Sequence, residues 1–170
     1  MGKTFKGIDV SQYQQGVDFK KVKAAGIDYV IIRAGFGKYA NQKDPCFENH
    51  YKAAKAAGLK GADAIIINTC GFIEEAKAEA QTCINAIKGK TFEYPIYFDL
   101  EERSQFAKGR AFCDSLVKTF CNALEHAGYW AGLYISRSPL QQYISAYVAK
   151  RYALWVAEYG SRCNYGGTYG

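Results

Sequence analysis

The sequence predicts an α/β protein built on a parallel β-sheet, because strand-like and helix-like segments alternate along the chain. Short apolar runs rich in Val, Ile, Tyr and Phe alternate with longer segments of helical character. Glycines follow most of the helical segments, as is usual where helices end. Successive β-α-β units join parallel strands through right-handed crossovers. A barrel and an open doubly wound sheet both satisfy this pattern.

Six strands and five helices are expected in this alternating order. The strands fall at 4–10, 28–34, 62–68, within 94–102, at 129–134 and at 152–157. The helices fall at 18–25, 45–58, 74–88, 105–127 and 138–150. Asp18 and Ser138 are suited to capping their helices, and Pro45 and Pro139 to the first turn. The segment 35–44 is expected to be a loop, and the tail from 160 to be irregular. No linker or repeat interrupts the pattern, which predicts one domain over 1–170.

The composition excludes several classes of partner. The net charge is +6, but the Lys and Arg residues are dispersed, so no nucleic-acid surface is expected. No apolar run reaches membrane-spanning length, so no membrane partner is expected, and residues 1–4 lead into the first strand without a signal peptide. A mild positive charge favours a polyanion such as a bacterial cell wall. The 14 tyrosines are a high number, which favours a site for sugar rings.

The cysteines and histidines predict no metal site and no cofactor. The six cysteines contain no C-x-x-C pair, so zinc and thioredoxin signatures are absent from the sequence. Cys113 and Cys121 share one helical stripe and are expected to be buried thiols. His50 and His126 lie on expected helices and are expected at the surface, without a role.

The fourth strand carries the strongest functional signal. Its apolar run ends in Asp99, Leu100 and Glu101. Strand side chains alternate, so the two carboxylates point to the same side, roughly 7 Å apart along the strand. Paired carboxylates at the end of a buried strand suit acid–base chemistry on a glycosidic bond. The alternative is a strand that simply runs into solvated acids.

Polar and aromatic side chains also end the other strands. In parallel α/β folds the carboxyl ends of the strands meet at one edge, so these side chains are expected in one shared cleft. The candidates are Asp9, Arg33, Asn68, Tyr134, Trp155 and Glu158. Structural roles are the alternatives: a turn residue for Asp9, an ion partner for Arg33, core aromatics for Tyr134 and Trp155, and a solvated strand exit for Glu158.

Several segments together resemble glycoside hydrolase family 25, the lysozymes (N-acetylmuramidases). They read GIDVSQYQ at 7–14, YVIIRAG at 29–35, YFDLE at 97–101, AGLY at 131–134 and LWVA at 154–157. The resemblance implies a modified TIM barrel with five βα units followed by three strands. It implies retaining cleavage of the β-1,4 bond between N-acetylmuramic acid and N-acetylglucosamine in peptidoglycan, at the cell wall or outside the cell.

The resemblance also implies a role for each candidate. Glu101 would protonate the leaving oxygen. Asp99 would steady the developing positive charge, or the substrate's own N-acetyl group acting as nucleophile. Asp9 would lie across the site and raise the pKa of Glu101 by repulsion. The sugar groove would be lined by Arg33, Tyr134 and Trp155.

Two segments depart from the family pattern. Residues 61–76, with NTCG at 68–71, resemble the N-terminal domain of radical-SAM methylthiotransferases, where the cysteine binds an iron–sulfur cluster. No matching set of thiolates accompanies Cys70, although a cluster needs three or four. Residue 170 also precedes the family's last two strands, which predicts a truncated, incomplete barrel whose unclosed edges favour self-association. The alternative functions are therefore an inactive, chimeric or engineered scaffold with weak glycan binding, and an iron–sulfur protein.

Overall fold

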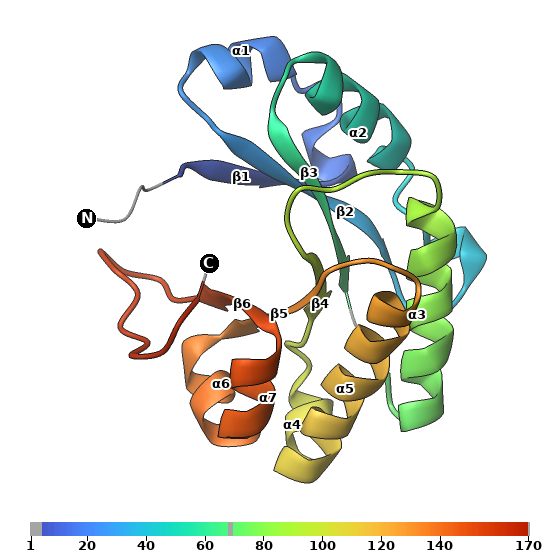
Figure 1. The fold of residues 1–170 in the computed structure, drawn as a ribbon, viewed down its shortest axis with the longest axis vertical. Helices are drawn as coiled ribbons and strands as arrows, with labels where there is room; N and C mark the ends of the chain where they lie inside the picture. Colours follow the sequence, from blue (N-terminus) through green and yellow to red (C-terminus); the bar gives the residue numbers. More distant parts are fainter. Residues whose placement is uncertain (1–4, 68–69, 170) are drawn as a thin grey trace.

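The computed structural model describes residues 5–67 and 70–169, and these form one parallel sheet with helices packed against it (Figure 1). The strands within this part of the chain are β1 (Gly7–Val10), β2 (Tyr29–Phe36), β3 (Lys60–Ile67), β4 (Ile96–Asp99), β5 (Ala131–Ser136) and β6 (Ala153–Ala157). The helices are α1 (Phe19–Ala24), α2 (Phe47–Ala56), α3 (Ile73–Ile87), α4 (Arg103–Phe106), α5 (Arg110–His126), α6 (Arg137–Tyr143) and α7 (Ala146–Arg151). Short 3₁₀ turns lie at η1 (Gln12–Gln14) and η2 (Ala40–Gln42).

The order of the strands decides between the two predicted architectures. Each strand pairs in parallel with its neighbour in sequence, in the order β1-β2-β3-β4-β5-β6. A doubly wound sheet reverses its strand order at a switch point, and the described strands show no reversal. Right-handed crossovers therefore place the helices on one side of a curled sheet (Figure 1). The expected barrel-type α/β fold is confirmed as a curled half-barrel, with β1 and β6 as its two edges in the described chain.

Alternation along the strands separates a helix-covered face from a concave inner face. Phe98 is fully buried toward the helices, where it stacks on Phe120 of α5 with ring centroids 4.4 Å apart. Its neighbour Tyr97 belongs to a second apolar cluster, with Ile31 and Ile65. Because strand side chains alternate, Asp99 must face the same inner side as Tyr97. The inner face therefore leads directly to the acid-bearing end of β4.

Two predicted helices are each divided in the structure. The segment 105–127 is interrupted at Gly109, whose φ of +85° lies in the left-handed region that glycine tolerates. The segment 138–150 is interrupted because Ile144 is extended, with φ −117° and ψ 134°. Ser145 then caps α7 by accepting from the Val148 N–H, at 3.3 Å. The N-cap of α6 is Ser136, not the predicted Ser138.

Other predictions need smaller corrections. The second strand continues through residues 35 and 36, and the rest of the expected loop contains η2. The predicted strand ends at Thr4 and Asn68 lie outside the described residues. The prediction that His50 is a surface residue is wrong, since it is 5% exposed and packs edge-on against Phe19. In the part of the chain that the structure describes, no helix is long and apolar enough to span a bilayer.

Candidate active site

Six of the eight side chains expected in one cleft line an open cavity at the carboxyl ends of the strands. Glu158 is not among the lining residues, and Asn68 lies outside the described residues. The cavity has a volume of about 220 Å³. Its lining includes Asp9, Arg33, Asp99, Glu101, Tyr134 and Trp155, together with Val10, Ser11 and Ile65. The register explains this convergence, because Asp99 pairs with Tyr134 across β4 and β5, and Tyr134 pairs with Trp155 across β5 and β6. Residues that are far apart in sequence therefore share one level of the inner face.

Asp99 is a buried acid that lines this cavity. Asp99 is only 6% exposed, and its Oδ1 atom has no hydrogen-bond partner among the described residues. Burial, and then the charges of Glu101 and Glu102, raise the pKa of Asp99 to about 8. A buried carboxyl with an unpartnered oxygen costs free energy, and such costs concentrate at functional sites. Asp99 is therefore placed to hold a proton at neutral pH and to meet a polar group of a ligand.

Glu101 lies in a more open position, two residues beyond Asp99. It is exposed to solvent, whereas Asp99 is buried, and both residues line the cavity. Partial desolvation, and then the charge of Glu102, raise the pKa of Glu101. The expectation that repulsion from Asp9 raises the pKa of Glu101 needs correction, because the charge that raises this pKa is that of Glu102. The two acids of the pair thus differ in exposure, but the pKa of each is raised.

Two aromatic side chains form one wall of the cavity. Tyr134 and Trp155 meet edge to face, with ring centroids 4.6 Å apart, and Tyr97 packs against Trp155 at 5.6 Å. Both wall residues are half-buried. Burial is the main cause that raises the pKa of Tyr134, so its hydroxyl remains a hydrogen-bond donor. The wall therefore combines core packing with apolar ring surface that faces the cavity.

Arg33 is both a cavity residue and an ion partner. Its Nε and terminal nitrogen each lie 2.7 Å from Oδ2 of Asp44, whose side chain is fully buried. The pairing of β2 with β3 shifts between Arg33 and Gly35, and such irregularities re-aim side chains at strand ends. Sequence reasoning missed Asp44, because an acid in a loop just before a helix is usually only a capping residue.

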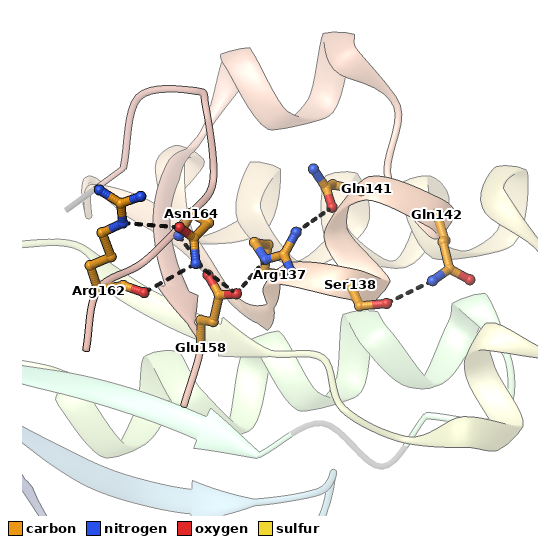
Figure 2. A network of polar contacts seen from close by, with 7 residues as sticks. All are labelled: Arg137, Ser138, Gln141, Gln142, Glu158, Arg162 and Asn164. Carbon is orange, nitrogen blue, oxygen red and sulfur yellow. Dashed lines mark hydrogen bonds and ion pairs between the residues drawn. The ribbon is translucent and has the colours of Figure 1, made fainter. Parts of the chain in front are cut away.

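Glu158 follows β6 at the same end of the sheet and anchors the tail (Figure 2). It accepts from Arg137 Nε at 2.7 Å and from the Asn164 backbone N–H at 2.6 Å. The Asn164 contacts and the Arg137 charge lower the pKa of Glu158. The Glu158 carboxylate is thus held by an ion pair and hydrogen bonds, and it is not the solvated strand exit that was the alternative.

Cys70 lies in an environment that does not suit an iron–sulfur cluster. It is 2% exposed, and burial followed by a hydrogen bond with Glu79 raises the pKa of its thiol far above the usual range. Cluster ligation needs several thiolates in one place. Among residues 5–67 and 70–169, no group of three or more His, Cys, Asp or Glu side chains is arranged to hold a metal ion.

Paired carboxylates in an open cavity at the carboxyl end of a curled parallel sheet suit acid–base cleavage of a glycosidic bond, the chemistry of glycoside hydrolases. The chain belongs to glycosyl hydrolases family 25, whose family model matches residues 8–167. The match covers every strand of the sheet except the first residue of β1. The family expected from the sequence is therefore confirmed.

Two curated relatives agree with this assignment, and a solved structure shares the fold. A probable family 25 lysozyme 2 of Dictyostelium discoideum is 29% identical over 160 residues, which are 90% of this chain and 71% of that protein. The autolytic lysozyme of Clostridium acetobutylicum is 30% identical over 162 residues, 91% of this chain and 45% of that protein. The autolysin LytC of Streptococcus pneumoniae, solved with a synthetic peptidoglycan ligand, superposes with a TM-score of 0.81 at 20% identity, over 95% of this chain and 39% of that one.

A shorter similarity involves a different family. A stretch of 61 residues is 41% identical to the ribosomal protein uS12 methylthiotransferase RimO of Helicobacter pylori. This stretch is 35% of the present chain and 14% of that protein. Such a partial match does not make the chain a member of the methylthiotransferases.

Proposed function

We propose that the chain is a muramidase, which hydrolyses the β-1,4 bond between N-acetylmuramic acid and N-acetylglucosamine in peptidoglycan with retention of configuration. The observation that carries this proposal is the Asp99–Glu101 pair in the open cavity. Membership of family 25 and the lysozyme relatives support the substrate and the bond. Residues 1–170 would act as one catalytic domain, at the cell wall or outside the cell.

The proton that acid catalysis needs is held by the carboxyl pair. Since the pKa of Asp99 is raised to about 8, the pair retains one proton at neutral pH. When Glu101 carries this proton and Asp99 is ionised, Glu101 delivers the proton to the leaving oxygen as the glycosidic bond breaks. Asp99 then steadies the positive charge that develops on the sugar, or on its N-acetyl group. Water completes the hydrolysis, so the reaction requires no metal or organic cofactor.

The remaining cavity residues orient the glycan. Asp9 places a further carboxylate across the site from the pair, at the end of β1. Tyr134 and Trp155 offer ring surface to the apolar faces of sugars, and Arg33 offers hydrogen-bond donors. These roles are testable one residue at a time, because each side chain comes from a different strand.

Release of reducing ends from purified peptidoglycan tests the proposal, with Glu101→Gln as the decisive variant. We expect this variant to lose at least about a hundredfold in kcat, the usual contribution of general acid catalysis. Glu74→Gln is the matched control, because Glu74 is also exposed but lies on α3 and does not line the cavity. Both variants should keep the parent's melting temperature.

The outcomes separate the two candidate functions. A catalytically normal Glu101→Gln variant would contradict the assignment of the acid. A folded parent that releases no reducing ends would favour the non-catalytic scaffold with weak glycan binding.

We also propose that the chain self-associates through its sheet edges. Within the described residues, β1 and β6 each pair with only one neighbouring strand, and unpaired edges are templates for pairing with another chain. Sedimentation velocity over a hundredfold concentration range would reveal such association as a rising mean sedimentation coefficient. A coefficient that stays constant at the monomer value would refute it.

A further inference from the structure

Tyr13 is an exposed aromatic residue on a tightly held turn beside the cavity. Its residue exposure is 77%, yet the 3₁₀ turn that carries it is fixed on both sides. Ser11 N–H donates to Gln14 Oε1 at 2.9 Å, and Tyr13 N–H donates to Ser11 Oγ at 3.3 Å. Ser11 itself lines the cavity. The ring is therefore presented to solvent by ordered backbone at the edge of the site.

A buried carboxylate connects this turn to the cavity wall. Asp44 Oδ2 accepts from the Gln12 backbone N–H at 3.0 Å and from Arg33 Nε at 2.7 Å. Its Oδ1 accepts from the Cys46 N–H at 2.9 Å. Because the Asp44 side chain is fully buried, these bonds are protected from competition with water. Asp44 thus fixes the turn and Arg33 relative to each other.

Arg33 in turn lies over the ring of Tyr13. The centre of its guanidinium is 5.2 Å from the ring centroid, a distance that permits cation–π attraction. An aromatic ring and a guanidinium whose position is fixed by Asp44 offer apolar surface and hydrogen-bond donors side by side. This combination suits a pyranose ring, which has apolar faces and a rim of hydroxyl and carbonyl oxygens.

The size of the cavity gives a reason for a site at this position. Its volume of about 220 Å³ is below the range of about 300–1,000 Å³ typical of small-ligand sites. A polymeric glycan must therefore place most of its rings outside the cavity. Ser11 and Arg33 line the cavity, and the Tyr13 ring lies against Arg33, so Tyr13 is positioned next to the cavity.

We propose that Tyr13, held by the Asp44–Arg33 pair, is the stacking platform of a further sugar-binding subsite next to the catalytic cavity. The subsite gives the protein a preference for long glycan strands over short fragments. Its substrate class rests on the proposed muramidase function, while the binding itself does not require catalysis. Asp44 is a positioning residue in this arrangement and does not touch the sugar.

Kinetics with substrates of two lengths test the subsite. The probes are peptide-free peptidoglycan glycan strands of eight sugars and the corresponding tetrasaccharide. We expect Tyr13→Ala to raise KM for the octasaccharide about fivefold to tenfold, as loss of one aromatic stacking contact predicts, with little change for the tetrasaccharide. Tyr13→Phe should restore the parent's KM, because it keeps the ring. Tyr147→Ala is the matched control, since Tyr147 is 69% exposed on the distant helix α7.

Binding measurements keep this inference separate from the proposed hydrolysis. Isothermal titration of the octasaccharide into Glu101→Gln and into Glu101→Gln/Tyr13→Ala should show a fivefold to tenfold weaker Kd for the double variant. Equal Kd values, or an equal rise in KM for both substrate lengths, would overturn the subsite. If the parent cleaves neither glycan, the hydrolysis proposal fails, and the titration alone decides whether the subsite exists.

Discussion

At the scale of single residues, the central feature is the raised pKa of Asp99. Alternation along β4 places its carboxyl on the inner face, where burial and two neighbouring glutamates oppose ionisation. The unfolded chain has no such penalty. A buried carboxyl that retains its proton in the folded protein therefore destabilises that protein as the pH rises, a trade-off that is common at active sites.

Asp99→Asn is expected to stabilise the protein at neutral and alkaline pH. The pKa of Asp99 is about 8 in the folded protein and about 3.9 in an unfolded chain, so only the folded form binds this proton between those values. The free energy of unfolding of the parent therefore falls as the pH rises through this window. The gain for the variant should reach about 2–5 kcal/mol at pH 8. Urea unfolding of the parent and the variant at pH 4 and pH 8 measures this gain. An equal difference in the free energy of unfolding at both pH values would contradict the explanation.

The same variant is expected to change the pH dependence of any residual hydrolysis. In the parent, activity should decline on the alkaline side near pH 8, where the carboxyl pair loses its last proton. Without Asp99, that proton must be held by Glu101 alone, so the alkaline limb should move to lower pH. Profiles of kcat/KM from pH 4 to 10 measure the shift. An unchanged alkaline limb would show that another group controls it.

At the scale of elements, the exits of the strands carry the interactions that organise the site. The exit of β4 supplies the acids, while the exit of β6 supplies Glu158, which joins α6 to the tail (Figure 2). Gln142 and Ser138 pair with each other on the same helix without contacting Glu158. The Glu158–Asn164 contact therefore anchors the tail, and the neighbouring Ser138–Gln142 contact provides a control for experiments on it.

Glu158→Gln is expected to loosen the tail without unfolding the sheet. The Asn164 backbone N–H donates to Glu158 at 2.6 Å, so hydrogen exchange at this N–H should accelerate in the variant. Because the pKa of Glu158 is lowered in the folded protein, this contact is intact at neutral pH and is lost as the pH falls through that lowered value. Exchange measured by mass spectrometry over 159–165 reports the effect. Gln142→Ala should leave exchange in this segment at the parent's rate.

At the scale of the whole molecule, the sheet and its helices share one apolar core. The side chains of β4 and β5 that face the helices are fully buried against α5, as Phe98, Leu133, Leu116 and Phe120 show. This layer holds the strands in the register that brings the cavity residues together. Damage to the core should therefore affect stability first and the site indirectly.

Phe98→Ala is expected to lower the free energy of unfolding by about 3–5 kcal/mol, the usual cost of deleting a buried phenylalanine. The fully buried ring loses its stacking contact with Phe120 and leaves a cavity. Phe72→Ala is the matched control, since Phe72 is 65% exposed and should change stability by less than about 0.5 kcal/mol. Chemical denaturation of both variants measures the difference. Similar losses for the two would contradict this account of the core.

The features that depend on local pattern could be predicted from the amino-acid sequence. The alternation of strands and helices predicts a parallel sheet, because side-chain period and turn residues are properties of neighbouring positions. The same period places Asp99 and Glu101 together, and the carboxyl ends of the strands bring Asp9, Arg33, Tyr134 and Trp155 to one edge. These six residues do line one cavity. Their catalytic and binding roles remain predictions.

The features that depend on partners distant in the sequence could not be predicted and follow from the folded arrangement. The sequential strand order, which excludes the doubly wound alternative, depends on which strands pair across the crossovers and not on any local period. The burial of His50, the Arg33–Asp44 pair and the raised pKa of Asp99 likewise depend on what packs around each side chain. Charge and burial act through space, so a carboxyl acquires its function only when folding fixes its surroundings.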